Sequence, residues 1–285
     1  MSKILVTGAT GQVGSELNFL SLIQKHGNEF HFLGHKDADI TDAASVSHLL
    51  SKGRYDFIIN CAAYTAVDKA ESEREEAFKV NAEGAGILAG VARTHNCKLV
   101  HISTDFIFDG SISRPLLEDD KANPLGVYGA SKWDGEKRVL SADPDALVIR
   151  TSWVYSSYGN NFVKTILRLC RERESLNIIY DQVGSPTYAR DLAAAILNLI
   201  AQEEWKAGVY NYSNEGVASW YDFAIAIRDM AGLKTKINPI ETSQYPTPAI
   251  RPKYSLLNKR KIKETYKLEI PYWRESLVDC IKLLT

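Results

Sequence analysis

The first fifteen residues constrain the fold of this chain most strongly. Residues 4–6, Ile-Leu-Val, form a short apolar run that is typical of a buried parallel strand. The glycine-rich stretch 8–14, GATGQVG, comes directly after it, and a helical pattern begins at Ser15. A dinucleotide-binding βα unit requires strand, glycine turn and helix start in this order. We therefore predict an α/β fold, a Rossmann-type doubly wound parallel sheet with a smaller C-terminal substrate-binding lobe.

The three glycines of this turn have separate physical roles. Gly8 can turn sharply off the strand, Gly11 lets backbone N–H groups approach a diphosphate, and Gly14 lets the helix lie close to the sheet. The helix N-terminus then presents free donors and a partial positive charge to the phosphates. The alternative is a glycine-rich turn that binds nothing. The cofactor-binding residues predicted in the turn are Gly8, Thr10, Gly11, Gln12, Val13 and Gly14.

Composition narrows the class of protein. The 285 residues are 45% hydrophobic, enough for one large domain or for a domain with a smaller partner. With 34 basic and 35 acidic residues, the net charge of −1 favours neither nucleic acid nor an anionic membrane as a partner. The four cysteines form no CxxC pair, so we expect no disulfide framework or zinc site. With a first strand at residue 3 or 4 and no long apolar run, we expect a cytoplasmic protein.

The end of the second predicted strand, 29–33, bears on cofactor choice. A site selective for NAD usually has an acidic residue there, which binds the ribose 2′-hydroxyl. Here His35 and Lys36 come after the strand, and a base suits a 2′-phosphate. We predict that both bind the cofactor and that NADPH is favoured, with NADH possible. Asp37 and Asp39 lie near enough in sequence to weaken this argument.

Two further stretches are predicted to contact the cofactor. Asp39 either lies beside the adenine or caps a loop, and Ile40 would cover the ring. A third strand, 56–60, ends in small side chains, which suit a close approach of backbone to ligand at the carboxyl edge of a sheet. The residues predicted there are Cys61, Ala62, Ala63 and Tyr64.

A possible catalytic group lies after the fourth predicted strand, 98–103. Ser103, Thr104 and Asp105 place two hydroxyls and a carboxylate just past a buried strand, where they either cap a turn or take part in chemistry. Tyr128 and Lys132 are four residues apart and share one helical face. A Y-x-x-x-K pair is common by chance. Here the pair is informative because it follows the glycine turn and the strand that ends near Thr104, in that order along the chain.

Beyond the predicted strand 146–151 the pattern becomes aromatic and polar. We divide the chain into a nucleotide-binding domain, 1–151 plus 176–212, and an interleaved sugar-nucleotide lobe, 152–175 plus 213–285. In the first third of the chain the pattern predicts four helices, one from 12 to about 25, one over 43–51, one over 68–78 and one over 81–94.

These features together resemble a known family. The chain is similar to the extended short-chain dehydrogenase/reductases, and among them to the dTDP-4-dehydrorhamnose reductases. The resemblance implies NADPH-dependent reduction of the 4-keto group of dTDP-4-dehydro-6-deoxy-L-mannose to dTDP-L-rhamnose, for cell-surface polysaccharide synthesis. The stretches that carry it are the glycine turn, CAAYTAVD at 61–68, STD at 103–105, YGASK at 128–132, RTSWVY at 150–155, GNNF at 159–162 and Arg251-Pro252.

The resemblance assigns roles in catalysis. Tyr128 would be the general acid, and Lys132 would lower the pKa of the phenol and hold the nicotinamide ribose hydroxyls. At an effective dielectric of about 20, one ammonium about 4 Å away contributes ~4 kcal/mol, enough for about three pKa units. Thr104 would bind the carbonyl oxygen. Ser103, Tyr128 and Lys132 also count among the predicted cofactor-binding residues.

The predicted substrate-binding residues lie mostly after the fifth strand. Thr104 binds the carbonyl, and Asp105 binds a sugar hydroxyl. Trp153 offers a flat wall for sugar or base, or is a core aromatic. Asn161 and Arg251 are candidates for the diphosphate, with Arg251 favoured for its bidentate geometry, although it could be plain surface.

One departure from the family pattern concerns metal. In some members, glutamates near the first helix and in a later loop share a magnesium ion across a dimer. This chain has Glu16 at the first place, but Ala189-Arg190-Asp191 at the second, in place of paired glutamates. We therefore predict no metal site and a monomer or weak homodimer.

Two rival functions share these motifs. A sugar-nucleotide epimerase or dehydratase of the same fold would return the hydride, so net consumption of NADPH separates it from a reductase. A non-catalytic subunit resembling the methionine adenosyltransferase β-subunit is the second rival. Intact Thr104, Tyr128 and Lys132 count against that purely regulatory role.

Overall fold

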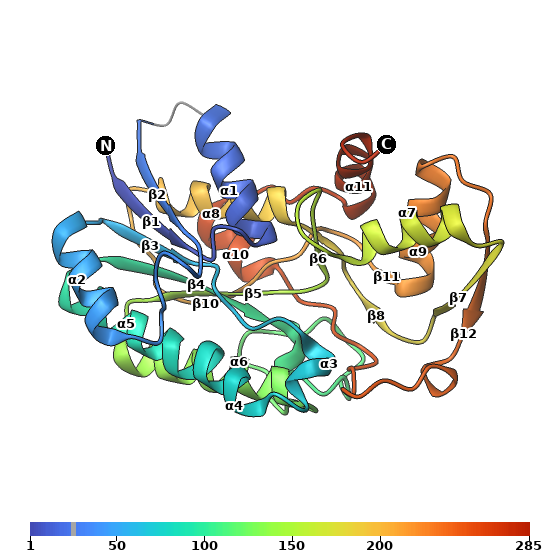
Figure 1. Cartoon of the computed structure of the whole chain (residues 1–285), viewed down its shortest axis with the longest axis horizontal. Helices are drawn as coiled ribbons and strands as arrows, with labels where there is room; N and C mark the ends of the chain where they lie inside the picture. The colour runs from blue at the N-terminus through green and yellow to red at the C-terminus, as the bar shows by residue number, and fades with distance from the viewer. Residues whose placement is uncertain (24–26) are drawn as a thin grey trace.

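A six-stranded parallel sheet forms the centre of the computed structural model, which describes residues 1–23 and 27–285. The strand order is β10-β5-β4-β3-β1-β2 (Figure 1). Because the chain passes from β1 to β2 on one side and to β3 on the other, a crevice opens at their carboxyl ends. This topology confirms the predicted fold class. The strands are β1 (Lys3–Thr7), β2 (Glu29–Leu33), β3 (Phe57–Asn60), β4 (Lys98–Thr104), β5 (Leu147–Thr151) and β10 (Gly208–Asn211).

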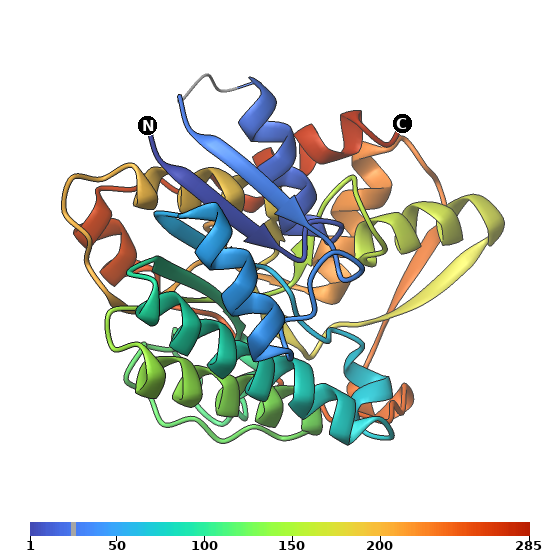
Figure 2. The ribbon, with the colours of Figure 1, turned by 60° about the vertical axis from the view of Figure 1, so that its left-hand side comes forward.

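Helices cover both faces of this sheet, as Figures 1 and 2 show. Successive side chains of a strand point to opposite faces, so β1 contributes to two cores. Ile4 and Val6 pack with Leu17, whereas Leu5 packs with Leu50 and Leu88. The first face carries α1 (Gln12–Ile23), α8 (Ala189–Ile200) and α10 (Arg260–Tyr266), and the second α2 (Ala43–Gly53), α5 (Ala85–Thr94) and α6 (Val127–Ala142).

A smaller lobe lies beside the carboxyl end of the sheet, at the right of Figure 1. Its helices share one apolar core with Tyr155 and Tyr188. The predicted domain boundaries stay a prediction, but β7, which they place with the large sheet, pairs instead with β12. The helices are α7 (Phe162–Glu172), α9 (Trp220–Met230) and α11 (Trp273–Lys282). The paired strands are β7 (Ser175–Ile179) with β12 (Lys236–Ile240), β8 (Val183–Gly184) with β11 (Ala218–Ser219), and β6 (Val154–Tyr155) with β9 (Thr187–Tyr188).

The helices predicted over 68–78 and 81–94 differ from the structure. The single helix over 68–78 is wrong: α3 (Val67–Ala70) and α4 (Arg74–Phe78) replace it. The break between them lets the Glu71 carboxylate accept a hydrogen bond from Val127 N at 2.8 Å, at the start of α6. Before α5 the chain forms one π-helical segment, η1 (Lys79–Gly84). The helix predicted over 12–25 is present as α1 over Gln12–Ile23, and the rest of that prediction lies outside the described residues.

None of the helices in the described ranges combines the length and apolar character that a membrane span needs.

Candidate active site

The glycine turn after β1 has the geometry that a diphosphate requires. Gly8 has a φ of +66°, and a Cβ there would collide with the backbone of Cys61 and Ala62 on the neighbouring turn. A Cβ on Gly14 would collide with Gly8 O, so α1 can lie this close only to a glycine. Gly11 is exposed, and the first N–H groups of α1 have no intrahelical acceptor. A dinucleotide diphosphate therefore fits this cradle.

The residues predicted to select the cofactor lie on the turn after β2. His35 and Lys36 are both exposed. Asp37 closes this turn by accepting a hydrogen bond from Gly34 N at 2.8 Å. Hydrogen bonds from the backbone and hydroxyl of Thr41 lower the pKa of Asp39, whose carboxylate therefore has the loop role. The part of His35 and Lys36 in binding a 2′-phosphate stays a prediction.

Ile40 and the turn after β3 complete the predicted cofactor side. Ile40 is buried against Gly84. Asn60 Oδ1 accepts from Thr7 Oγ1 at 2.7 Å and from Ala62 N at 3.1 Å, which fixes the turn carrying Cys61, Ala62 and Ala63. Burial raises the pKa of the Cys61 thiol to about 12, so it is no nucleophile near neutral pH.

Sequence reasoning missed Asn81, which organises the turn at Tyr64. Its side chain accepts from Tyr64 N at 2.9 Å and donates to Tyr64 O and to Ser131 Oγ, each at 3.0 Å. The Tyr64 phenol donates to Glu73 at 2.6 Å. Asn81 therefore joins the predicted cofactor turn to α6, and no local motif marks it.

The three predicted catalytic residues come together where β4 ends. Thr104 is the last residue of β4, and its hydroxyl donates to Asp105 Oδ1 at 3.2 Å in the short 3₁₀ helix η2 (Asp105–Ile107). Tyr128 packs edge-on against Phe106, with ring centroids 5.5 Å apart. Lys132 Nζ donates to Ile102 O at 2.6 Å. The β4 end and the turn after it thus contact both the lysine and the tyrosine of α6.

Burial shifts the pKa of each titratable group at this site in the direction that favours its neutral form. It raises the pKa of Tyr128 to about 12, where the Thr104 hydroxyl opposes the shift and the Asp105 charge adds to it. It lowers the pKa of Lys132 to about 8 and raises that of Asp105 to about 6. This overturns the expectation that Lys132 holds the phenol below its ordinary pKa. The phenol is instead fully protonated near neutral pH, as a proton donor must be.

Ser103 is buried, and its hydroxyl is engaged within the protein. It donates to Glu136 Oε1 at 2.5 Å, one turn beyond Lys132 on α6. A direct contact between the Ser103 hydroxyl and the cofactor stays a prediction.

Trp153 lies at the seam between sheet and lobe in an unusual conformation. Its φ of +46° is left-handed, and its ring stacks on Trp220 with centroids 3.6 Å apart and an 8° angle. A cavity of about 680 Å³ adjoins this stack, lined by Phe162, Gln182, Trp220 and Arg251 among others. The predicted substrate wall is thus one half of an aromatic pair.

The two predicted diphosphate residues have protein partners. Arg251 lines the cavity but forms a bidentate ion pair with Asp68, at 3.0 and 2.8 Å. Asn161 caps α7 by accepting from Lys164 N at 3.1 Å, and it donates to Gln12 Oε1 at 2.9 Å. That last contact ties the glycine-turn helix to the lobe.

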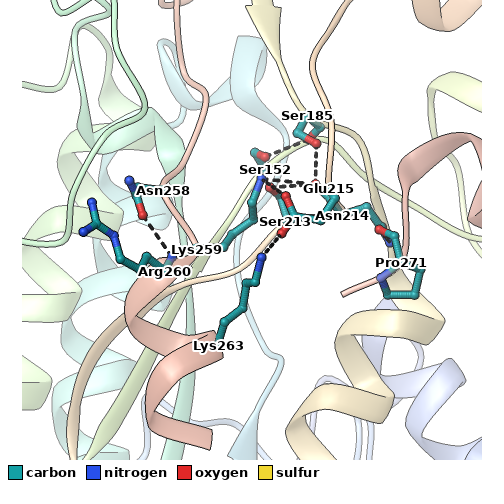
Figure 3. A network of polar contacts seen from close by, with 10 residues as sticks. All are labelled: Ser152, Ser185, Ser213, Asn214, Glu215, Asn258, Lys259, Arg260, Lys263 and Pro271. Atoms are coloured by element: carbon teal, nitrogen blue, oxygen red, sulfur yellow. Dashed lines mark hydrogen bonds and ion pairs between the residues drawn. The ribbon is translucent and has the colours of Figure 1, made fainter. Parts of the chain in front are cut away.

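A buried polar network fixes the segment before Trp153, as Figure 3 shows. Ser152 Oγ donates to Ser185 O at 2.8 Å, and Ser185 Oγ donates to Asn214 O at 2.6 Å. Lys259 Nζ, 3.5 Å from the same Asn214 carbonyl, also pairs with Glu215 at 3.3 Å. Because these residues come from distant segments, no sequence motif reveals the network.

Glu16 already has a cationic partner. Its carboxylate is fully buried, pairs with Arg190 Nε at 2.8 Å and accepts from Ser156 Oγ at 2.6 Å. Within 1–23 and 27–285, no group of three His, Cys, Asp or Glu side chains is placed to hold a metal ion. The predicted lack of a metal-bridged dimer stays a prediction, and Arg190 gives it a physical reason.

A nucleotide-binding crevice that adjoins a Thr–Tyr–Lys group, with Thr104 and Lys132 buried and Tyr128 partly buried, defines an NAD(P)-dependent oxidoreductase of the extended short-chain dehydrogenase/reductase type. The family model of the RmlD substrate binding domain matches residues 2–285. The dTDP-4-dehydrorhamnose reductases of Aggregatibacter actinomycetemcomitans and Escherichia coli (strain K12) are each 40% identical to the chain, with 97% and 95% of it covered, and 97% and 94% of the relatives. The chain therefore belongs to the RmlD family of dTDP-4-dehydrorhamnose reductases.

A solved structure agrees over the whole chain. The crystal structure of dTDP-4-dehydrorhamnose reductase from Bacillus anthracis str. Ames in complex with NADP has a TM-score of 0.94 and 38% identity, covering 99% of each chain. The resemblance inferred from the motifs is thereby confirmed.

Proposed function

We propose that this chain reduces the 4-keto group of dTDP-4-dehydro-6-deoxy-L-mannose with NADPH, forming dTDP-L-rhamnose for cell-surface polysaccharide. The observation that carries the proposal is the partly buried, protonated Tyr128 beside the buried Thr104 at the crevice that receives the dinucleotide. Membership in the reductase family and the NADP in the Bacillus anthracis structure support both reaction and cofactor.

NADPH supplies a hydride to the keto carbon, and the chain must supply the proton. Thr104 donates a hydrogen bond to the carbonyl oxygen and orients it, and Tyr128 delivers its phenolic proton to the alkoxide that forms there. The Lys132 ammonium stabilises the resulting phenolate and holds the nicotinamide ribose hydroxyls. Its backbone anchor at Ile102 O keeps it close to the end of β4, where Thr104 lies.

The seam beside Trp153 suits the sugar nucleotide. Trp220, stacked on Trp153, lines the adjoining cavity with an apolar ring, and Arg251 brings a cation to it. Its pairing with Asp68 is compatible with binding an anion, since a diphosphate can exchange for the carboxylate. The hydrogen-bond geometry leaves Asp105 Oδ2 without a partner among the described residues, although the Ser255 hydroxyl lies close enough to lower the pKa of Asp105, and we assign this oxygen a sugar hydroxyl.

A product assay tests this proposal. The purified chain is incubated with NADPH and dTDP-4-keto-6-deoxy-L-lyxo-hexose, the loss of absorbance is monitored, and the product is identified. Stoichiometric NADPH oxidation with dTDP-L-rhamnose as product is expected. Turnover of the sugar without net NADPH oxidation would instead indicate an epimerase or dehydratase, and a stable hetero-oligomer without turnover would indicate the regulatory role.

A further inference from the structure

Glu136 lies on the helical face that carries Tyr128 and Lys132, one turn beyond the lysine. Its side chain is completely buried. Arg150 Nε lies 3.1 Å from both of its carboxylate oxygens, and Arg150 Nη2 lies 2.8 Å from Oε2. Together with the bond from Ser103, this leaves the carboxylate tightly held. Burying such a pair is costly, so stability alone is a weak reason for it.

The contacts of Glu136 join the catalytic helix to the catalytic strand. Consecutive residues of β4 bind consecutive turns of α6: Ile102 O accepts from Lys132 Nζ, and Ser103 Oγ donates to Glu136. Arg150 stands directly opposite Ser103 in the register of β4 and β5. The next residue along β4 is Thr104. The Glu136 contacts therefore set how α6 is placed against the residue that orients the carbonyl.

We propose that Glu136, fixed by Ser103 and Arg150, is a positioning residue of the reduction, whose carboxylate keeps Lys132 in place and in its ammonium form. Only the kinetic consequence of this role rests on the proposed function. The titration of Lys132 does not require turnover.

The electrostatic environment of Lys132 supports this role. Burial lowers the pKa of the amine, and the Glu136 charge opposes that effect. The Cys61 thiol, whose pKa is raised to about 12, is uncharged near neutral pH, and burial holds the pKa of His101 low, so that the imidazole is neutral. The groups whose charges act on Lys132 are Cys61, His101 and Glu136. Tyr128 lies one turn before Lys132 on α6, and Arg150 pairs with Glu136. Glu136 therefore supplies the negative charge that favours the ammonium.

Glu136→Gln tests the proposal, because glutamine keeps the shape and removes the charge. The protein is prepared with ¹³Cε-labelled lysine, and the Lys132 signal is assigned by its loss in Lys132→Arg. We expect a Lys132 midpoint near pH 8 in the parent and at least about one pH unit lower in Glu136→Gln, because a unit charge one helical turn away, at an effective dielectric of about 20, is worth more than ~1.36 kcal/mol. The basic limb of kcat/KM should move with it.

Two further variants make the measurement specific. Asp134→Asn removes the same charge from the outer face of α6, where it pairs with Arg138, and should leave the Lys132 midpoint unchanged. Arg150→Gln removes the cation and leaves Glu136 free to act on Lys132, so the midpoint should rise. This opposite shift also carries the test if Glu136→Gln does not fold.

The proposal is overturned if the Lys132 midpoint is unmoved in Glu136→Gln, or moves in the same direction in both variants. A lowered melting temperature with an unchanged midpoint shows a purely structural ion pair. A shifted midpoint in a protein that never oxidises NADPH with the sugar nucleotide would refute the proposed function and leave the Glu136 inference standing.

Discussion

Replacing Asp105 by Asn should stabilise the protein at alkaline pH while it weakens the site. The side chain of Asp105 is 1% exposed, and burial raises its pKa from 3.8 to about 6. A carboxyl whose folded pKa is raised binds its proton more tightly in the native state. Its contribution to stability is therefore complete below about pH 4 and is lost as pH rises through about 6.

The size of the effect comes from the shift in pKa. A difference of about 2 units at ~1.36 kcal/mol per unit amounts to about 3 kcal/mol by pH 8, and about half of that is already lost at pH 5. Asparagine carries no charge, and its Oδ1 can still accept from Thr104. Asp105→Asn should thus raise the free energy of unfolding at both pH values, by about 1.5 kcal/mol more at pH 8 than at pH 5.

Urea unfolding at pH 5 and pH 8, monitored by circular dichroism and by fluorescence, measures this difference where the two probes coincide and the m-values agree. Asp119→Asn, at an exposed turn, is the matched control and should show no such pH dependence. A stability gain in Asp105→Asn that is equal at both pH values, or a loss at pH 8, would show that the burial of this charge is not costly. The same variant should raise the KM for the sugar nucleotide.

The site supports three other predictions. Tyr128→Phe should lower kcat by about 10²–10⁴-fold, because it removes the proton donor, while the NADPH Kd stays the same; normal turnover would exclude Tyr128 as the acid. By fluorescence titration, NADPH should bind at least as tightly as NADH, and a clear NADH preference would refute the role of His35 and Lys36. Arg190→Met should lower the free energy of unfolding in urea by about 3 kcal/mol, because it leaves the buried Glu16 carboxylate without its cation. Neither Mg²⁺ nor EDTA should change turnover of the parent, and a magnesium requirement would contradict the predicted lack of a metal site.

Local patterns predicted the parts of the site that short segments determine. The glycine turn, the end of β4 and the shared face of Tyr128 and Lys132 each depend on fewer than about ten consecutive residues. Glycine at position 8 is required by a positive φ and by the adjacent turn, so its role is readable from spacing. The helix predicted over 68–78 was wrong because the break that brings Glu71 to Val127 depends on an element 56 positions away.

Long-range pairs were not predictable from sequence, because either partner alone looks like an ordinary surface residue. Arg251 pairs with Asp68, 183 positions away, and Arg190 pairs with Glu16, 174 positions away. A charged side chain that is already engaged in such a pair is not free to bind a ligand unless the ligand displaces its partner. Sequence reasoning could therefore nominate Arg251 for a diphosphate but could not show that a carboxylate already occupies it.

The pKa shifts of the titratable groups at and near Tyr128 have one main physical cause, burial, but the groups titrate at different pH values. Burial favours the neutral form of each, so Asp105 and Lys132 titrate on either side of neutrality, at about 6 and about 8, while Tyr128 stays protonated throughout. A reductase needs a phenol that holds its proton until an alkoxide forms. The pH dependence near neutrality must then come from the charges around the phenol, and the proposed role of the Glu136 carboxylate is to set one of them, that of Lys132.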